Sequence, residues 1–131
     1  MLLVRGVLRT GEEREDDVTQ SRDLKDRARA LLALQTVAYA LGVPAEEIDQ
    51  PTRGAARASL ARQVAIYLTH VAFEMSLQRC ASAFGRDRST AAYACHRIED
   101  RRDEAEFDTF LDDLEACLRS APPPAWLLER A

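Results

Sequence analysis

Residues 61–99, ARQVAIYLTHVAFEMSLQRCASAFGRDRSTAAYACHRIE, contain the pattern that decides the fold of this chain. Ser76 can cap a short helix, in which apolar residues follow at helical spacing: Leu77, Cys80, Ala81 and Phe84. Gly85 supplies the left-handed residue that ends this helix, and a second helix follows almost at once. The stretch therefore predicts a helix-turn-helix at about Ser76 to Arg102, preceded by a longer helix.

The joint of this motif is strongly polar. Arg86, Asp87 and Arg88 fall in the turn, and Ser89 and Thr90 follow at the start of the second helix. In helix-turn-helix proteins this end of the second helix enters the major groove of DNA. Because a glycine between two short helices is common in proteins, the motif by itself indicates DNA binding only moderately.

Two blocks in this region, ARQVAIYL and SLQRCASAFGRDRSTAAYACHRIE, resemble the C-terminal DNA-binding domain of the bacterial replication initiator DnaA. That family has RQ-x-A-x-Y-L, a helix that begins with Ser-Leu, FGGRDHTTV and a closing HA-x-x-KI in the same order. The resemblance extends from about Leu31 to Leu118 and includes the segment GVPAEEI. It implies an all-α, Trp-repressor-like domain of about five to six helices that binds double-stranded DNA, without the ATPase domain of the full initiator.

The resemblance also implies which residues would contact DNA. Base edges would be read at the positions of Arg86, Asp87, Arg88 and Ser89. Phosphates would be contacted at the positions of Arg62, Gln63, Thr90, Tyr93 and Arg97, and in the basic loop at Arg53 and Arg57. The carboxylate of Asp87 would accept a hydrogen bond from a base amine, and Arg88 would reach a guanine edge. The phosphate contacts would set register and affinity without sequence choice.

Some of these residues also have an ordinary structural interpretation. Arg97 could lie on a solvated helix face, and Tyr93 could be a packed ring with its hydroxyl at the rim. Asp87 could cap the second helix, or could both cap it and read a base. The sequence leaves these alternatives open.

Three departures from the family pattern alter the expected DNA contacts. FGRDRST replaces FGGRDHTT, so that one glycine is lost and Arg88 stands where the family has histidine. The basic loop is reduced to PTRGAARAS, and His70 stands where the family has lysine. Because each lost base contact costs about 1–3 kcal/mol, we expect weaker or altered recognition of the initiator's DNA box.

The charge is unevenly distributed along the chain. The formal net charge is −4 over 131 residues, which alone argues against a nucleic-acid partner. Residues 51–100, however, contain seven basic and four acidic side chains, and all seven basic ones are arginine. Arginine matches phosphate oxygens and guanine edges better than lysine does, so the charge pattern favours DNA binding by the segment that contains the motif.

The sequence predicts one helical domain between two tails. We expect residues 1–20 to be a disordered acidic tail, residues 21–120 to form the domain, and residues 121–131 to be a proline-rich, apolar tail. A long first helix should begin at Ser21 and end at Gly42. Its predicted inward face is Leu24, Ala28, Leu31, Leu32, Val37, Ala38 and Leu41.

No feature of the sequence predicts an enzyme or a cofactor. Lys25 is the only lysine and no Gly-rich phosphate loop is present, so a P-loop ATPase is excluded. The two histidines and three cysteines lack the spacing of metal ligands, and no metal is expected. Three cysteines without a CxxC pair favour a reducing cytoplasm. MLLVRGVL is too short for a signal peptide or membrane span, and we expect a cytoplasmic, nucleoid-associated protein.

Two classes of function remain open. The first is a stand-alone, sequence-specific DNA-binding protein that acts in the control of replication initiation, at origins, or in transcription. The second is a protein-binding regulator that engages the initiator or the AAA+ partner that inactivates it. The acidic flanks and the tail at Trp126 favour the second class, and the mid-chain arginines favour the first. Nothing in the sequence resembles a dimerisation zipper, so a monomer is expected.

Overall fold

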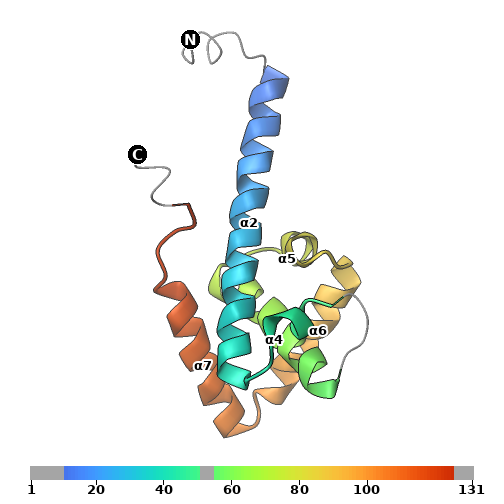
Figure 1. Ribbon diagram of the computed structural model, residues 1–131, viewed down its shortest axis with the longest axis vertical. Helices are drawn as coiled ribbons and strands as arrows, with labels where there is room; N and C mark the ends of the chain where they lie inside the picture. The colour runs from blue at the N-terminus through green and yellow to red at the C-terminus, as the bar shows by residue number, and fades with distance from the viewer. Residues whose placement is uncertain (1–10, 51–54, 126–131) are drawn as a thin grey trace.

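The computed structural model describes residues 11–50 and 55–125, and every regular element in these two ranges is a helix (Figure 1). The helices are α2 (Gly11–Leu41), α3 (Ala45–Ile48), α4 (Ala56–Ala72), α5 (Leu77–Phe84), α6 (Arg88–Arg101) and α7 (Ala105–Arg119). The predicted all-α fold class is therefore confirmed. Interpretations that concern Arg53 and Trp126 lie outside the described residues.

The first helix is longer than predicted. α2 begins at Gly11, so the expectation of a disordered tail is wrong for residues 11–20. The acidic residues near its start are favoured there by the helix dipole, and no proline or further glycine interrupts the sequence before Gly42. Gly42 ends the helix at a φ of +67°, as predicted, and Val43 donates its N–H to the carbonyl of Ala38 at 3.2 Å.

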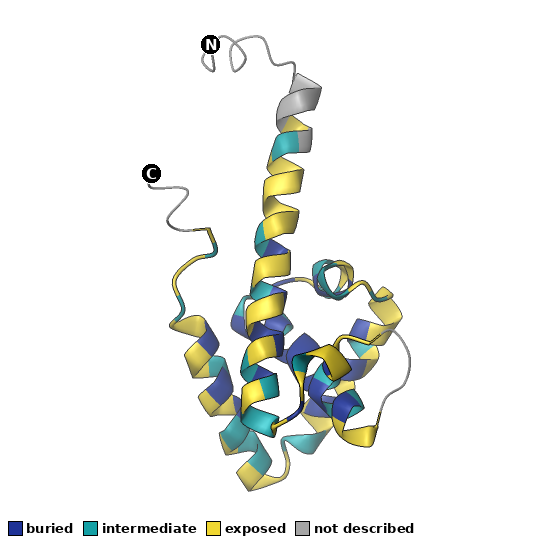
Figure 2. Ribbon diagram, viewed as in Figure 1, coloured by how far each residue is buried: buried dark blue, intermediate teal, exposed yellow. Residues whose placement is uncertain are grey.

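The buried face of α2 also differs from the prediction. Val37 is buried as predicted, together with Ala30, Ala33 and Leu34, whereas the expected inward residues Leu24, Ala28, Leu31 and Leu32 are exposed (Figure 2). From Ala30 to Leu41 nearly every residue of this helix is apolar, so periodicity alone could not select the packed side. The small side chains of Ala30 and Ala33 let the neighbouring helix approach closely, and packing selects that side.

α4 is the centre of the domain. It contacts α2, α3, α5, α6 and α7, and its central residues from Val64 to Thr69 are all buried. Two alanines with no exposed surface, Ala61 and Ala65, belong to the core cluster that joins α4 to Val37, Ile98 and Leu111 of the surrounding helices. The small residues of α4 therefore allow one helix to be enclosed by several others.

The helix-turn-helix forms as its local signals predict. The Ser76 hydroxyl accepts the N–H of Arg79 at 3.2 Å and caps α5. Gly85 ends α5 at a φ of 65°, and Arg86 donates its N–H back to the carbonyl of Ala81 at 2.8 Å. α6 begins three residues after the glycine. The predicted motif boundaries are correct, and Phe84 and Ile98 both pack in the core.

His70 closes the corner between α4 and α5. Its Nδ1 lies 2.6 Å from the carbonyl oxygen of Met75, which can only accept, so Nδ1 carries the proton. Glu74 has a positive φ of 54° in this tight connection. The residue that replaces the family's lysine therefore has a structural partner in this chain.

Candidate nucleic-acid interface

The start of α6 lies in solvent. Asp87, Arg88, Ser89 and Thr90 are all exposed, and they occupy the N-cap and the first turn of the helix. Asp87 takes the extended backbone conformation of an N-cap residue, but its side chain makes no capping hydrogen bond. Of the two roles open to Asp87, capping by its carboxylate is therefore absent here. The carboxylate is placed to accept a hydrogen bond from outside the chain.

The outer face of α6 continues this exposed surface. Ser89, Tyr93 and Arg97 follow one another at intervals of one turn, whereas Ala91 and Ala94 are buried on the opposite side. The Tyr93 ring is exposed, so the interpretation of Tyr93 as a packed ring is wrong. Arg97 donates to the Tyr93 hydroxyl at 3.3 Å and its guanidinium lies 5.8 Å from the ring centroid. This pair forms a cationic, aromatic edge along the helix.

Arg86 differs from its neighbours in the motif. It is half-buried, and its Nη2 donates to the carbonyl oxygen of Gln50 at 2.5 Å. The hydrogen bond joins the turn between α5 and α6 to the residues that follow α3. In this conformation Arg86 supports the turn, and base reading by Arg86 would require a change in its side chain. Its predicted base contact stays a prediction.

Arg62 also binds backbone within the domain. Its Nε donates to the carbonyl oxygen of Ile48 at 2.7 Å, and its Nη2 is buried without a hydrogen-bond partner. Burial, followed by the positive charge of Arg86, lowers the pKa of Arg62, and Asp49 opposes the shift. Arg62 thus attaches α4 to the end of α3 instead of projecting into solvent as a free phosphate ligand would. Its predicted phosphate contact stays a prediction.

The remaining predicted phosphate contacts differ in accessibility. Arg57 is exposed in the first turn of α4, and Gln63 is half-buried one residue after Arg62. Arg57, Arg88 and Arg97 are the predicted contact arginines that are exposed in the described part of the chain. The structure therefore separates an outer set of arginines from an inner pair, Arg62 and Arg86, that fixes the backbone beneath them.

Sequence reasoning missed the residues that hold α5 in place. Arg79 binds Asp26 through two hydrogen bonds, from Nε at 2.8 Å and from Nη2 at 2.6 Å. Asp26 is buried, with 3% of its surface exposed. Such two-bond pairs between arginine and carboxylate fix orientation as well as distance. The pair positions the first helix of the motif against α2, and no local signal in the sequence links two residues so far apart.

A second polar network holds the far end of α6. The Tyr67 hydroxyl donates to Glu99 Oε2 at 2.5 Å and accepts from Arg102 Nη1 at 3.1 Å. Arg102 also donates to Asp108 at 2.5 Å and to Asp112. The network joins α4, α6 and α7 at one corner. Both ends of the motif are therefore attached to the rest of the domain by charged hydrogen bonds.

Residues 11–50 and 55–125 contain no group of three or more His, Cys, Asp or Glu side chains arranged to hold a metal ion. In the same ranges, no helix combines the length and apolar character needed to cross a membrane.

The exposed, arginine-bearing start of α6 defines a helix-turn-helix protein whose second helix is available for recognition. A comparison with protein families matches residues 32–98 to the bacterial DnaA protein helix-turn-helix. The match covers just over half of the chain and includes α5 and all of α6 except its last three residues. The chain belongs to this family, and the matched segment is a DnaA-like helix-turn-helix DNA-binding domain.

Among solved structures, the crystal structure of a DNA replication initiation factor is similar to this chain, with a TM-score of 0.67 and 27% sequence identity. The similarity covers 77% of this chain and 31% of the other, so this chain corresponds to about a third of that protein's length. A comparison with curated proteins gave no match.

Proposed function

We propose that this chain binds double-stranded DNA sequence-specifically through the start of α6, in the control of chromosome replication initiation or of transcription. The observation that supports the proposal is the exposure of Asp87, Arg88 and Ser89 at the N-terminus of the recognition helix. The Asp87 carboxylate makes no capping bond there. One domain would read one site as a unit, and the protein would be found in the cytoplasm on the nucleoid.

In this proposal the exposed side chains have two kinds of task. Arg88 donates to the O6 and N7 acceptors of a guanine, and Asp87 accepts from the amine of a cytosine or adenine. Thr90, Tyr93 and Arg97 contact phosphates along one strand, and Arg57 contacts the backbone from the start of α4. Arg62 and Arg86 act indirectly, because they hold the residues around Ile48 and Gln50 beneath this surface.

A binding titration on two duplexes tests the proposal. The first duplex is selected from a random library by the wild-type protein, and the second is its scrambled version. Fluorescence anisotropy at several salt concentrations should give a steep fall of log affinity with log salt, and a clear preference for the selected duplex. If the selection enriches no sequence, or if the protein binds the selected and the scrambled duplex equally, sequence-specific recognition is refuted.

The second class of function is a protein-binding regulator that engages the initiator or its AAA+ inactivating partner without reading DNA. It is favoured by the carboxylates on the surface of α7, where Glu106, Asp112 and Asp113 are exposed. Such a surface would repel a DNA backbone and would suit a basic protein surface. The same titration separates the two classes, because a protein-only regulator should show no salt-dependent DNA binding beyond a weak background.

A further inference from the structure

Most of the large apolar side chains that remain exposed lie on one helix. The described part of the chain exposes six of them, and one is Tyr93 of the DNA-binding surface. The other five are on α2, and we call them the α2 stripe: Val18, Leu24, Leu31, Leu32 and Tyr39. Tyr39 is 91% exposed and Val18 is 69% exposed. A row of large apolar groups in solvent marks an interaction surface.

The α2 stripe lies on the side of the helix that the domain cannot cover. With about 100° of rotation per residue, the stripe is centred opposite the buried residues Asp26, Ala30 and Val37. In Figure 2 exposed residues run along α2 from its projecting N-terminal part into the domain. Only a partner outside the domain could therefore bury this side.

The spacing within the stripe indicates that this partner is another helix. Leu24 and Leu31 are seven residues apart, as are Leu32 and Tyr39, and Val18 precedes Leu32 by two such intervals, with Lys25 at the position between them. Repeats of seven keep apolar residues on the seam between two packed helices. Three such intervals between Val18 and Tyr39 cover about 32 Å of helix.

The stripe is also nearly symmetric in sequence about Ala28, which is small and exposed. Leu24 precedes Ala28 by four residues and Leu31 follows it by three, while Val18 and Tyr39 lie ten and eleven residues away. Apolar residues thus occur at nearly the same distances before and after Ala28. This spacing is expected for two identical helices that pack antiparallel around a two-fold axis. We propose that two copies of this chain pair through α2 in this way, with the axis at Ala28.

The contacts of the pair follow from this axis. Leu24 packs against Leu31 of the partner subunit, and Val18 packs against Tyr39 of the partner subunit. Ala28 lies beside Ala28 of the partner subunit, where its small side chain lets the two helices approach. All five residues of the α2 stripe then lie in or beside the seam.

Charge selects the antiparallel arrangement. Residues 11–17 of α2 contain five acidic side chains and one basic one, whereas residues 30–41 contain no charged side chain. A parallel pair would place the two acidic segments beside each other and would be destabilised by repulsion. In the antiparallel pair with its axis at Ala28, residues 15–17 lie beside residues 39–41 of the other helix, which carry no charge. The antiparallel arrangement therefore avoids this repulsion.

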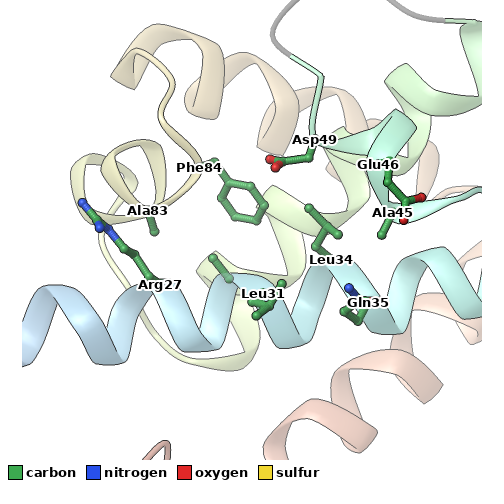
Figure 3. A pocket seen from close by; sticks show the side chains of 10 residues that line it. Arg27, Leu31, Leu34, Gln35, Ala45, Glu46, Asp49, Ala83 and Phe84 are labelled. Atoms are coloured by element: carbon green, nitrogen blue, oxygen red, sulfur yellow. The ribbon is translucent and has the colours of Figure 1, made fainter.

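A groove at the edge of the stripe adds apolar surface. It has a volume of about 360 Å³ and lies between α2, α3 and the end of α5 (Figure 3). Leu31, Leu34 and Phe84 line its middle, with Arg27 towards one end and Asp49 towards the other. Because Leu31 belongs to both the groove and the stripe, Leu24 of the partner subunit would sit at the mouth of the groove. Pairing would therefore shield part of this groove as well.

The pair would leave the DNA-binding surface open. α6 packs on α4 and α5, and the stripe faces away from α4. The inference is thus independent of the proposed DNA contacts, although a dimer would carry two recognition helices.

Sedimentation equilibrium of the full chain tests the pairing. The wild type should be a dimer, and Leu24→Glu combined with Leu31→Glu should be a monomer that keeps the helical circular dichroism spectrum, because both side chains are exposed in the protomer. Gln78→Glu, which places the same charge on an exposed position of α5, should stay dimeric. A wild type that is monomeric at every accessible concentration would overturn the proposal, as would a double variant that remains a dimer.

Disulfide trapping tests the orientation and the axis. The cysteine variants are made in a Cys117→Ser background, because Cys117 is exposed. Cys80 and Cys95 can stay, since burial raises the pKa of Cys80 to about 12 and that of Cys95 to about 11 and so disfavours their reactive thiolates. Ala28→Cys should form a covalent dimer on mild oxidation. Gln35→Cys should not, because the antiparallel register separates the two copies of residue 35 by about 20 Å. Trapping through both positions would indicate a parallel pair, and absence of trapping through Ala28→Cys would exclude the axis; either result overturns the proposal.

Discussion

Asp26 and Arg79, which lie 53 positions apart in the chain, form the two-bond ion pair that joins the long first helix to the first helix of the motif. Asp26 is almost fully buried, while the Arg79 side chain keeps about a third of its surface exposed. The hydrogen bonds to Asp26 raise the pKa of Arg79, and burial opposes the shift. Removing Arg79 and removing Asp26 should therefore lower the free energy of unfolding by different amounts.

We expect Arg79→Ala to destabilise the protein by about 1–3 kcal/mol, because the buried Asp26 carboxylate then loses two hydrogen bonds and keeps the 3.4 Å contact with Arg29. Asp26→Leu combined with Arg79→Met should recover much of this loss, since neither side chain is then charged. Urea denaturation measures both changes. Arg22→Ala, which removes an exposed arginine of α2, should change stability by less than about 0.5 kcal/mol. A similar loss for Arg22→Ala and Arg79→Ala would contradict the role given to the pair.

Leu68→Ala should destabilise the protein by about 2–5 kcal/mol, because Leu68 is fully buried in the core around α4. Chemical denaturation followed by circular dichroism gives the free energy of unfolding. Leu32→Ala is the matched control, because Leu32 is exposed on α2. Measured in the monomeric variant Leu24→Glu with Leu31→Glu, it should lower the free energy of unfolding much less than Leu68→Ala does. Equal losses at the two positions would mean that the buried side of α2 is assigned wrongly.

Arg88→Ala should reduce the preference for a selected duplex over its scrambled version, because Arg88 opens the recognition helix. Arg97→Ala should weaken binding to both duplexes equally and lower the slope of log affinity against log salt by about one unit. Anisotropy titrations on the two duplexes measure both effects. If the variants lose affinity on both duplexes in the same proportion, Arg88 does not read bases.

Arg62→Ala should act through the fold as well as through DNA. Loss of the hydrogen bond to the Ile48 carbonyl should lower stability by about 1 kcal/mol, and affinity should fall on both duplexes. If Arg62 acts only through this hydrogen bond, the salt slope should stay at the wild-type value. A slope lower by one unit with unchanged stability would instead restore the direct phosphate contact that the family resemblance implies.

The Tyr67 network should make stability depend on alkaline pH. Burial and the hydrogen bond to Glu99 raise the pKa of Tyr67 from 10 to about 12. Because the folded pKa lies above the unfolded one, this contribution is fully present below about pH 10 and is lost as the pH rises towards 12. Tyr67→Phe should remove that part of the slope. Urea midpoints of the two proteins between pH 9 and pH 12 should converge as the pH rises; parallel curves would refute the assignment.

The helix-turn-helix could be predicted because its signals are local. Ser76 and Gly85 each act within one turn of chain, and their roles follow from hydrogen bonding and from a positive φ. The exposure of Arg88 likewise follows from its place at the start of a helix. These features depend on neighbours in sequence, so the sequence was sufficient for them.

Long-range packing explains the predictions that were wrong or missing. Leu24 and Leu31 satisfied the apolar period of α2 as well as Leu34 did, and only the position of the other helices distinguished them. The orientation of Arg62 depends on a carbonyl that α3 brings to it. Asp26 could not be assigned to Arg79, since many charged residues offered equivalent partners.

The two alanines buried in α4 affect the orientation of the recognition helix α6 relative to the rest of the domain. Ala61 and Ala65 have no exposed surface, and α4 lies against both α2 and α6. An extra methyl group at either position would push helices apart, at a cost of about 1–3 kcal/mol. The displacement would tilt the recognition helix relative to the rest of the domain. The angle at which α6 would enter a DNA groove therefore depends on the small size of Ala61 and Ala65, which do not contact DNA themselves.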